Sequence, residues 1–258
     1  MKNTDLLLIY DDHCPLCSWY SGQFVKYGLL QKENRQPFSK VAEHWLQQID
    51  FDASRNRIPL IDKKTGTVTY GLDALLVLLG QRFPWIQRVG HWKPVHAFLE
   101  QLYALISYNR KVVVAVKCGN GEIDCAPDFH LGYRITFLLL LQVLIGGATT
   151  ASSLLLDKLQ LFSHSANVLQ YGVIAIAVLL LVRGFLLPLE KRMEYYGQWS
   201  MLGMLYSVQL VVLLVLVNLL GASVFLLGAG SSLILLRWYK SWKRRMAFTG
   251  VKPCVSMG

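Results

Sequence analysis

Charged side chains are scarce in this sequence of 258 residues. They make up 16% of it and hydrophobic residues 53%, whereas a typical soluble domain is about 25% charged. This shortage argues against a disordered chain and against an ordinary cytosolic enzyme. The five cysteines are also too few for a fold held together by disulfides. The composition is that of a chain partly dissolved in lipid.

Acidic residues almost disappear from the second half of the chain. Residues 134–258 hold 11 Lys/Arg and 3 Asp/Glu, a net charge of +8, whereas residues 1–133 hold 15 and 13, a net charge of +2. The positive charge therefore lies in the more apolar half. A nucleic-acid-binding protein would gather it on a soluble face instead. We expect membrane topology, and not nucleic-acid binding, to explain the excess.

Long apolar blocks follow Arg134, at residues 135–156, 166–187 and 199–238. A spanning helix needs about 20 residues, and the third block has roughly twice that length. It therefore predicts two spans, with the turn between them near Asn218, Gly221 and Ser223. The sequence predicts an all-α bundle of four transmembrane helices over residues 134–245, followed by a basic tail at residues 246–258. Residues 134–253 contain no cysteine that could carry electrons across a bilayer, so the bundle is expected to act as an anchor or a platform for partners.

Positive charge alternates between the predicted connections. Lys and Arg precede the first span, separate the second from the third, and follow the fourth, whereas the first connection has only Lys158, offset by Asp157. Loops rich in Lys and Arg stay in the cytoplasm. The pattern therefore predicts an integral protein of the plasma or inner membrane with both termini cytoplasmic, whose basic end contacts anionic lipid headgroups.

The first half has the pattern of a soluble α/β domain over residues 1–115, joined to the bundle by a juxtamembrane loop at residues 116–133. Residues 5–10 form a short apolar run of the kind found in the central strand of a sheet. Alternating patterns follow, which predict strands near residues 36–39, 57–61 and 67–70 and helices near residues 14–29, 41–48, 71–83 and 94–107. This order of strands and helices is that of a thioredoxin-like domain.

The motif Cys14-Pro15-Leu16-Cys17 follows the first predicted strand and begins a helix, which is a redox signal. Pro15 suits the first helical position, which places Cys14 near the N-cap. Cysteines three residues apart on a helical turn are close enough to form a disulfide. The helix N-terminus also favours a thiolate at the first cysteine. We therefore predict that Cys14 attacks a substrate disulfide and that the more buried Cys17 resolves the mixed disulfide.

Acidic neighbours complicate this prediction. Asp11 and Asp12 would oppose a thiolate at Cys14, whereas a protonated His13 would favour it, and the sequence does not rank these effects. Asp11 has two interpretations. It is either the group that exchanges a proton with Cys17, or a turn residue that caps the helix.

Other roles for the cysteines remain open. Zinc needs about four ligands, and Cys118 and Cys125 could supply a second pair beside the first. The latter two could also form a relay or regulatory disulfide, or stay unpaired. Cys254 is interpreted as a bystander. A third alternative is a non-catalytic protein that docks a partner at the membrane. The preferred interpretation involves neither a metal nor a cofactor.

The first cysteines and their surroundings resemble the signature of the DCC family, predicted thiol-disulfide oxidoreductases named for DxxCxxC. The matching residues span residues 5–111 and consist of Leu8-Ile9-Tyr10-Asp11, Cys14-Pro15-Leu16-Cys17, Ile58-Pro59, Gly71, Asp73-Ala74, Tyr103 and Asn109-Arg110. Asp12 is a departure, because members usually have Gly at that position, and it makes the loop stiffer and more acidic.

The resemblance implies a thioredoxin-like fold with Cys14 and Cys17 as the redox pair. Pro59 would match the cis-proline that faces the cysteines in such folds, and would leave the Ile58 backbone free to pair with an extended substrate. From sequence alone, Pro59 is equally a proline that starts a strand. The expected function is a membrane-anchored oxidoreductase at the cytoplasmic face, a reductase or redox sensor. It would act on a protein or small-molecule disulfide with an unidentified electron donor.

Overall fold

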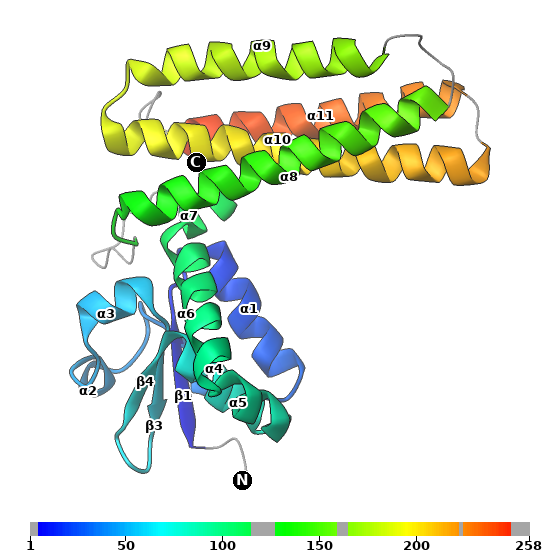
Figure 1. Cartoon of the computed structure of the whole chain (residues 1–258). Coiled ribbons are helices and arrows are strands. Elements are labelled where there is room, and N and C mark those ends of the chain that lie inside the picture. Colours follow the sequence, from blue (N-terminus) through cyan, green and yellow to red (C-terminus); the bar gives the residue numbers. More distant parts are fainter. Residues whose placement is uncertain (1–4, 115–126, 159–164, 222–223, 249–258) are drawn as a thin grey trace. The chain divides into compact units, whose positions relative to one another are not determined.

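The computed structural model describes residues 5–114, 127–158, 165–221 and 224–248 of the chain. The chain divides into two compact units, Met1–Tyr133 and Arg134–Gly258. The first unit holds all the strands of the described residues, and the second is helical (Figure 1).

A mixed four-stranded sheet organises the first unit. Its strands are β1 (Leu6–Tyr10), β2 (Arg35–Pro37), β3 (Pro59–Asp62) and β4 (Val68–Tyr70), in the order β2-β1-β3-β4. β2 runs parallel to β1, whereas β3 is antiparallel to β1 and to β4. The predicted central position of the first strand is thereby confirmed. Leu7, Leu8 and Ile9 of β1 are all 0% exposed, as expected of a strand covered on both faces.

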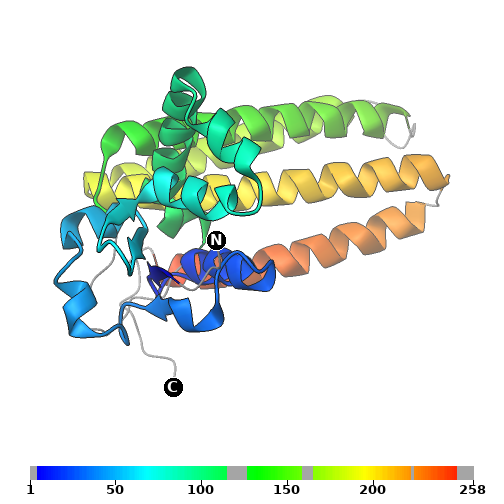
Figure 2. The same ribbon diagram turned by 90° about the horizontal axis from the view of Figure 1, so that it is seen from below.

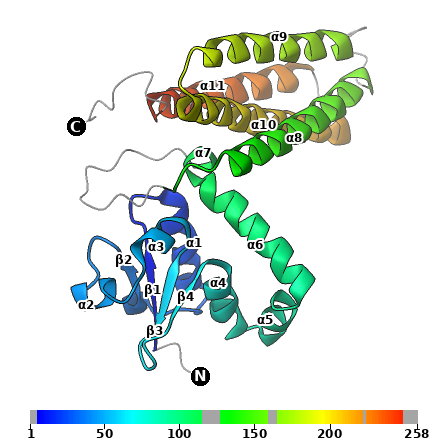
Figure 3. The same cartoon turned by 60° about the vertical axis from the view of Figure 1, so that its left-hand side comes forward.

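Helices connect and cover these strands (Figure 3). They are α1 (Pro15–Lys26), the 3-10 turn η1 (Lys32–Asn34), α2 (Glu43–Leu46), α3 (Phe51–Asn56), α4 (Gly71–Gly80), α5 (Pro84–Gly90), α6 (Lys93–Tyr108) and α7 (Arg110–Val113). The predicted alternation is therefore present. The single helix predicted over residues 41–48 is wrong in extent, because two short helices fill the connection from β2 to β3. The Asp50 side chain caps the second of them by accepting hydrogen bonds from the backbone N–H groups of Asp52 and Ala53.

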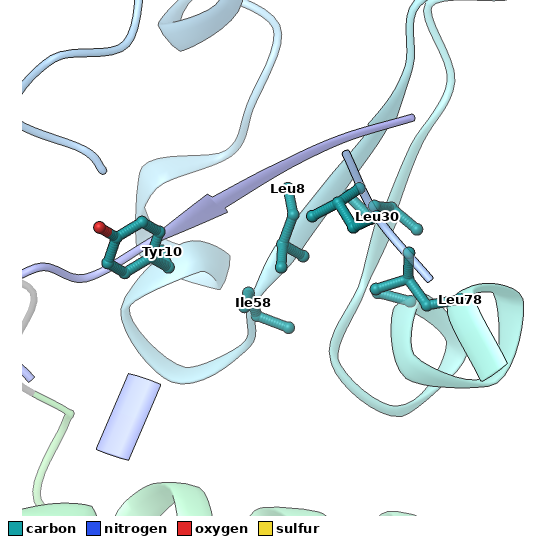
Figure 4. Packing of buried hydrophobic residues seen from close by; sticks show 7 residues of the cluster. Leu8, Tyr10, Leu30, Ile58 and Leu78 are labelled. Carbon is teal, nitrogen blue, oxygen red and sulfur yellow. The ribbon is translucent and has the colours of Figure 1, made fainter. Parts of the chain in front are cut away.

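The apolar residues of β1 alternate between two core clusters, because successive side chains of a strand point to opposite faces. Leu7 and Ile9 join one cluster, against which Trp45 of α2 packs. Leu8 and Tyr10 join the other cluster, which Figure 4 shows with Leu30, Ile58 and Leu78. Side chains of α1 and α4 pack in this second cluster. The sheet therefore fixes the end of β1 and the start of α1 rigidly with respect to each other.

Four long helices make up the second unit: α8 (Leu131–Lys158), α9 (Ser165–Phe185), α10 (Leu189–Leu220) and α11 (Val224–Phe248). Figure 2 shows them as extended rods, coloured green to red. α10 contacts both α9 and α11. It ends at Gly221, whose φ of 57° suits the left-handed conformation of a helix C-terminus. This break lies where the sequence predicts the turn between the last two apolar segments.

Among the described residues, α8 and α10 are long and apolar enough to cross a membrane. Side-chain hydrogen bonds join these two helices. Gln142 Nε2 donates to Ser200 Oγ at 2.9 Å, and Asn218 Nδ2 lies 3.5 Å from the Leu155 carbonyl oxygen. Polar contacts of this kind hold helices together where no water competes.

Candidate redox site

A tight turn between β1 and α1 positions the candidate site. Asp11 directly follows β1, and its Oδ1 accepts a hydrogen bond from the His13 backbone N–H at 3.0 Å. The Asp11 carbonyl oxygen accepts from the Cys14 N–H at 3.3 Å. Pro15 then occupies the first turn of α1, where its missing N–H costs nothing. The turn brings the acidic side chain and the first cysteine to the same end of β1.

Cys14 is the N-cap residue of α1, as the sequence predicts. Its sulfur accepts a hydrogen bond from the Cys17 backbone N–H at 3.3 Å. Both cysteines are free thiols, and their sulfurs lie within 4.8 Å of each other. The expected greater burial of Cys17 is not found, because Cys14 is 2% exposed and Cys17 is 4% exposed. Both sulfurs are enclosed because the start of α1 packs close to the core of the sheet.

The two thiols differ in acidity. The hydrogen bond from the Cys17 thiol, aided by the Cys17 backbone N–H, outweighs burial and lowers the pKa of Cys14 from 9.0 to about 7. The same hydrogen bond raises the pKa of Cys17 well above the ordinary value, because Cys17 keeps the shared proton. Burial of Cys17 raises this pKa further. The pKa of Cys14 therefore lies below that of Cys17, so Cys14 is the thiol that ionises more readily.

Arg110, at the start of α7, completes the site. Its Nη1 lies 3.8 Å from the Cys17 sulfur and its Nη2 lies 3.5 Å from Asp11 Oδ2. Nη2 also donates a hydrogen bond to the Arg55 carbonyl oxygen at 3.0 Å. The side chain is 8% exposed, so these partners replace water around a permanent charge.

The contacts of Arg110 are not apparent from the sequence. The residue belongs to the resemblance, but 93 positions separate it from Cys17. Its own surroundings, an apolar helical segment, give no signal of a sulfur partner. Arg110 comes close to Cys17 and Asp11 only when the chain folds.

The structure ranks the effects of neighbouring charges on the pKa of Cys14, which the sequence does not. Arg110 lowers the pKa of Cys14, and Asp11 opposes it with a smaller effect. His13 acts on Asp11, with its ring Nδ1 4.0 Å from Oδ1. Asp12 is exposed, and its Oδ2 accepts a hydrogen bond from Ser39 Oγ at 2.7 Å. The acidic departure at position 12 is therefore hydrogen-bonded to Ser39, and it also raises the pKa of Asp11.

Asp11 is buried and has a raised pKa. Desolvation is the largest cause, and it exceeds the lowering by Arg110 and by the His13 N–H. One carboxylate oxygen and the two cysteine sulfurs all lie within 4.8 Å of one another. A carboxylate with raised pKa is a stronger base than a free one, so this geometry suits a proton acceptor. Asp11 also shapes the turn, but the expectation that it caps the helix is wrong, because Cys14 is the N-cap residue of α1.

Pro59 does not have the role that the resemblance implies. The peptide bond before it is trans, and Pro59 is the first residue of β3, opposite Tyr70 of β4. The Ile58 backbone is also engaged. Its N–H donates to the Tyr103 hydroxyl at 3.1 Å, and its carbonyl oxygen accepts from the Gly71 N–H at 2.9 Å. The expectation that Ile58 is free to pair with a substrate is therefore wrong, and Pro59 is a strand-start proline.

The same residues were considered as a zinc site. Asp11, Cys14 and Cys17 present donor atoms close together, but a structural zinc site needs about four ligands. The proposed further ligands, Cys118 and Cys125, lie outside the described residues, as does Cys254. Arg110 contacts two of the three donors and already supplies positive charge to them. Among the described residues the donors are therefore fewer than a structural zinc site needs, and this guanidinium would repel a dication beside it.

No protein-family model, curated protein or solved structure matches this chain. The chemistry of the site accordingly has to be inferred from its own geometry: a dithiol at a helix start, a buried carboxylate and a buried guanidinium.

Proposed function

We propose that the protein is a membrane-anchored thiol-disulfide oxidoreductase with Cys14 as the attacking and Cys17 as the resolving cysteine. One observation carries this proposal. The Cys14 sulfur accepts the Cys17 N–H at the start of α1 and has a pKa of about 7, while the adjacent Cys17 retains its proton. The N–H donor at a helix start is the kind of environment that stabilises the thiolate of a reactive cysteine.

The fold of the first unit supports a thioredoxin-like assignment. The elements follow the order strand, helix, strand, helices, strand, strand, helix. The sheet order β2-β1-β3-β4, with only β1 and β2 parallel, agrees with that assignment. The dithiol follows the carboxyl end of the central strand, which is where ligands bind in open α/β sheets.

The proposed reaction has two exchange steps. The Cys14 thiolate attacks one sulfur of a protein or small-molecule disulfide, and the other sulfur leaves as a thiolate that takes a proton from water. Cys17 then transfers its proton to Asp11 and attacks the Cys14 sulfur. The second substrate sulfur leaves, and a Cys14–Cys17 disulfide forms. The substrate gains two electrons, and an electron donor of the dithiol class returns the protein to its reduced state.

The lowered pKa accelerates the first step by a modest factor. At pH 7 a thiol of pKa 7 is about half ionised and one of pKa 9.0 about 1%, a gain of roughly 50-fold in thiolate. A thiolate of lower pKa is also a weaker nucleophile, which reduces this gain by a factor of roughly 8. The net advantage is about 6-fold, so the pKa selects which cysteine attacks more than it sets the speed. Access of the substrate to a thiol that is 2% exposed is the larger constraint.

We further propose that the second unit anchors this domain through four spans. Only 11% of the most apolar stretch of α8 and 28% of that of α10 are buried. A core helix of a soluble protein would be mostly buried, so these exposures support lipid as the surrounding medium. The charge pattern of the sequence supports α9 and α11 as the remaining spans, with both termini in the cytoplasm. A reducing compartment favours a reductase or redox sensor over a disulfide-forming enzyme.

A single-turnover trap tests the redox proposal. The full chain, reconstituted in lipid nanodiscs and fully reduced, is mixed with oxidised glutathione and quenched with acid for mass analysis. We expect the unaltered chain to proceed to the Cys14–Cys17 disulfide. Cys17→Ser should stop at a mixed disulfide between Cys14 and glutathione, and Cys14→Ser should form neither product. Cys254→Ser is the matched control and should behave as the unaltered chain does.

The same preparations separate the alternatives. Modification of Cys14 no faster than of Cys254, or a mixed disulfide that forms as rapidly on Cys17 in Cys14→Ser, contradicts the proposal. Zinc at one equivalent per chain, lost together with the fold in Cys125→Ser, would instead support the zinc-stabilised module. A docking protein would keep its cellular function after Cys14→Ser.

A further inference from the structure

The contacts of Arg110 differ from those of an ordinary buried arginine. A carboxylate oxygen of Asp11 and the carbonyl oxygen of Arg55 face one guanidinium nitrogen, Nη2, at 3.5 and 3.0 Å. The other nitrogen, Nη1, faces the Cys17 sulfur at 3.8 Å. A neutral thiol is a poor partner for a buried cation, and a thiolate is a strong one. The contact with sulfur therefore gains most in a state where Cys17 has lost its proton.

The two cysteines do not feel Arg110 equally. For Cys17, Arg110 is the largest influence that lowers the pKa. For Cys14, the Cys17 thiol and the Cys17 backbone N–H both lower the pKa more than Arg110 does. Cys14 can thus ionise with the help of its helix and its neighbour. Cys17 depends on the guanidinium.

We propose that Arg110 is a catalytic residue of the resolving step, in which its guanidinium stabilises the thiolate that forms on Cys17. The inference rests on the proposed function and assigns to this step a residue that the attacking step uses little.

The charge balance of the second step explains the need for this cation. After the first exchange the Cys14 sulfur is bonded to the substrate and is no longer an anion, so it ceases to hold the Cys17 proton. Burial then remains as the main obstacle to ionisation of Cys17. The proton moves to Asp11, and a sulfur–sulfur bond forms between Cys17 and Cys14. The bond between Cys14 and the substrate sulfur breaks, and the substrate leaves as a thiolate.

Other groups around Cys17 do not replace Arg110. Among the residues that the structure describes, the titratable and charged groups that act on Cys17 are Cys14 and Asp11 from the turn and helix start, Tyr20 of α1, Tyr103 of α6 and Arg110 of α7. Burial raises the pKa of Tyr20 well above its ordinary value and that of Tyr103 to about 12, so both stay neutral near pH 7. Arg110 is the only cation of this set. Its planar fork contacts Asp11 and Cys17 together, which a single ammonium group does less well.

A chromogenic disulfide separates the two steps. The reduced full chain in nanodiscs, with Cys118, Cys125 and Cys254 replaced by Ser, is mixed with 5,5′-dithiobis(2-nitrobenzoate). The first exchange on Cys14 releases one coloured thiolate, and attack by Cys17 releases the second. We expect Arg110→Gln to change the first phase by less than about 3-fold and to slow the second by about 10- to 1,000-fold at pH 7, since an adjacent opposite charge shifts a pKa by about 1–3 units.

The pH profile distinguishes catalysis from a structural effect. In Arg110→Gln, the pH at which the second phase reaches half its maximal rate should rise by about 1–3 units. Arg110→Lys should restore part of the rate, because it keeps the charge but not the fork. Arg57→Gln is the matched control. It removes an exposed arginine that pairs with Glu100 at 3.0 Å and should leave both phases unchanged.

The outcomes separate this inference from the proposed function. Absence of a Cys14-dependent first phase in the parent chain contradicts the proposed function. A normal pair of phases in the parent, with the second phase still fast in Arg110→Gln or slowed without any shift in its pH profile, overturns the role of Arg110 alone. If Arg110→Gln does not fold, Arg110→Lys decides. A slower second phase with a displaced pH profile supports the inference, and two unchanged phases overturn it.

Discussion

The two units of this chain place their apolar side chains in opposite positions. In the first unit, the central strand buries Leu7, Leu8 and Ile9 completely. In the second, Val143 is 72% exposed and Leu219 is 77% exposed. Water drives the first arrangement and would penalise the second. The comparison shows that the two units expose their apolar side chains very differently, which supports the proposal that lipid surrounds the second.

Both units also bury an arginine, and the comparison shows what makes one of them chemically interesting. In the second unit, Arg245 Nη1 donates to the amide oxygen of Gln198 at 2.6 Å, a partner that does not change its charge. In the first unit, Arg110 faces a thiol and a carboxylate, two groups whose charge depends on whether they carry a proton. Burial of a charge is therefore not enough to mark a functional site. The chemistry of its partners decides.

The largest effect on stability is expected from a cavity in the core of the first unit. Ile9→Ala removes a fully buried side chain of β1 and should reduce the free energy of unfolding of the first unit by about 2–5 kcal/mol. Val143→Ala is the matched control at a side chain of α8 that is 72% exposed, and it should change the free energy of unfolding by less than about 0.5 kcal/mol. Urea titration of nanodisc samples, followed by hydrogen exchange of the β1 amides, measures both. Equal losses in the two variants would contradict the comparison.

A lysine introduced into either unit should affect membrane insertion only when it replaces a residue of the second unit. Val143 lies near the middle of α8, and Val143→Lys should disfavour membrane insertion by about 2.5–3.5 kcal/mol. Val89→Lys alters a valine that is 49% exposed in the first unit, and should leave insertion unchanged. The fraction of chain resistant to alkaline extraction from membranes measures the effect. If Val143→Lys inserts as well as the parent chain, α8 does not face the bilayer core.

Sequence patterns predicted the framework because they follow local rules. The apolar run at residues 5–10 and the helix start at Pro15 depend on neighbours in the chain, so β1, α1 and the N-cap role of Cys14 could be predicted. Arg110 and the engaged Ile58 backbone could not, since their partners lie 93 and 45 positions away. The burial of Cys14 likewise depends on packing against the sheet and not on its motif.

The dithiol should show its asymmetry directly in alkylation kinetics. With iodoacetamide, the rate at Cys14 should reach half its maximum near pH 7, well below the ordinary pKa of 9.0. Cys17 should remain unmodified in the same pH range, because its pKa is raised. Peptide mass analysis after timed quenching measures both sites. A Cys14 midpoint near pH 9, or equal labelling of the two cysteines, would remove the basis for assigning their roles.

The smallest effect concerns the carboxylate beside the dithiol. Burial raises the pKa of Asp11 above 3.8. The folded state therefore favours the protonated acid, and its contribution to stability is full below pH 3.8 and is lost as the pH rises through the folded pKa. Ionised Asp11 costs stability at pH 7, so Asp11→Asn should stabilise the reduced first unit there, and the gain should vanish in acid. Asp12→Asn, at the exposed neighbour, should give little change at either pH. Urea titrations at pH 4 and pH 7 measure the difference. A loss at pH 7 would mean that Arg110 holds the carboxylate ionised, and a gain that is the same at both pH values would mean that folding does not raise its pKa.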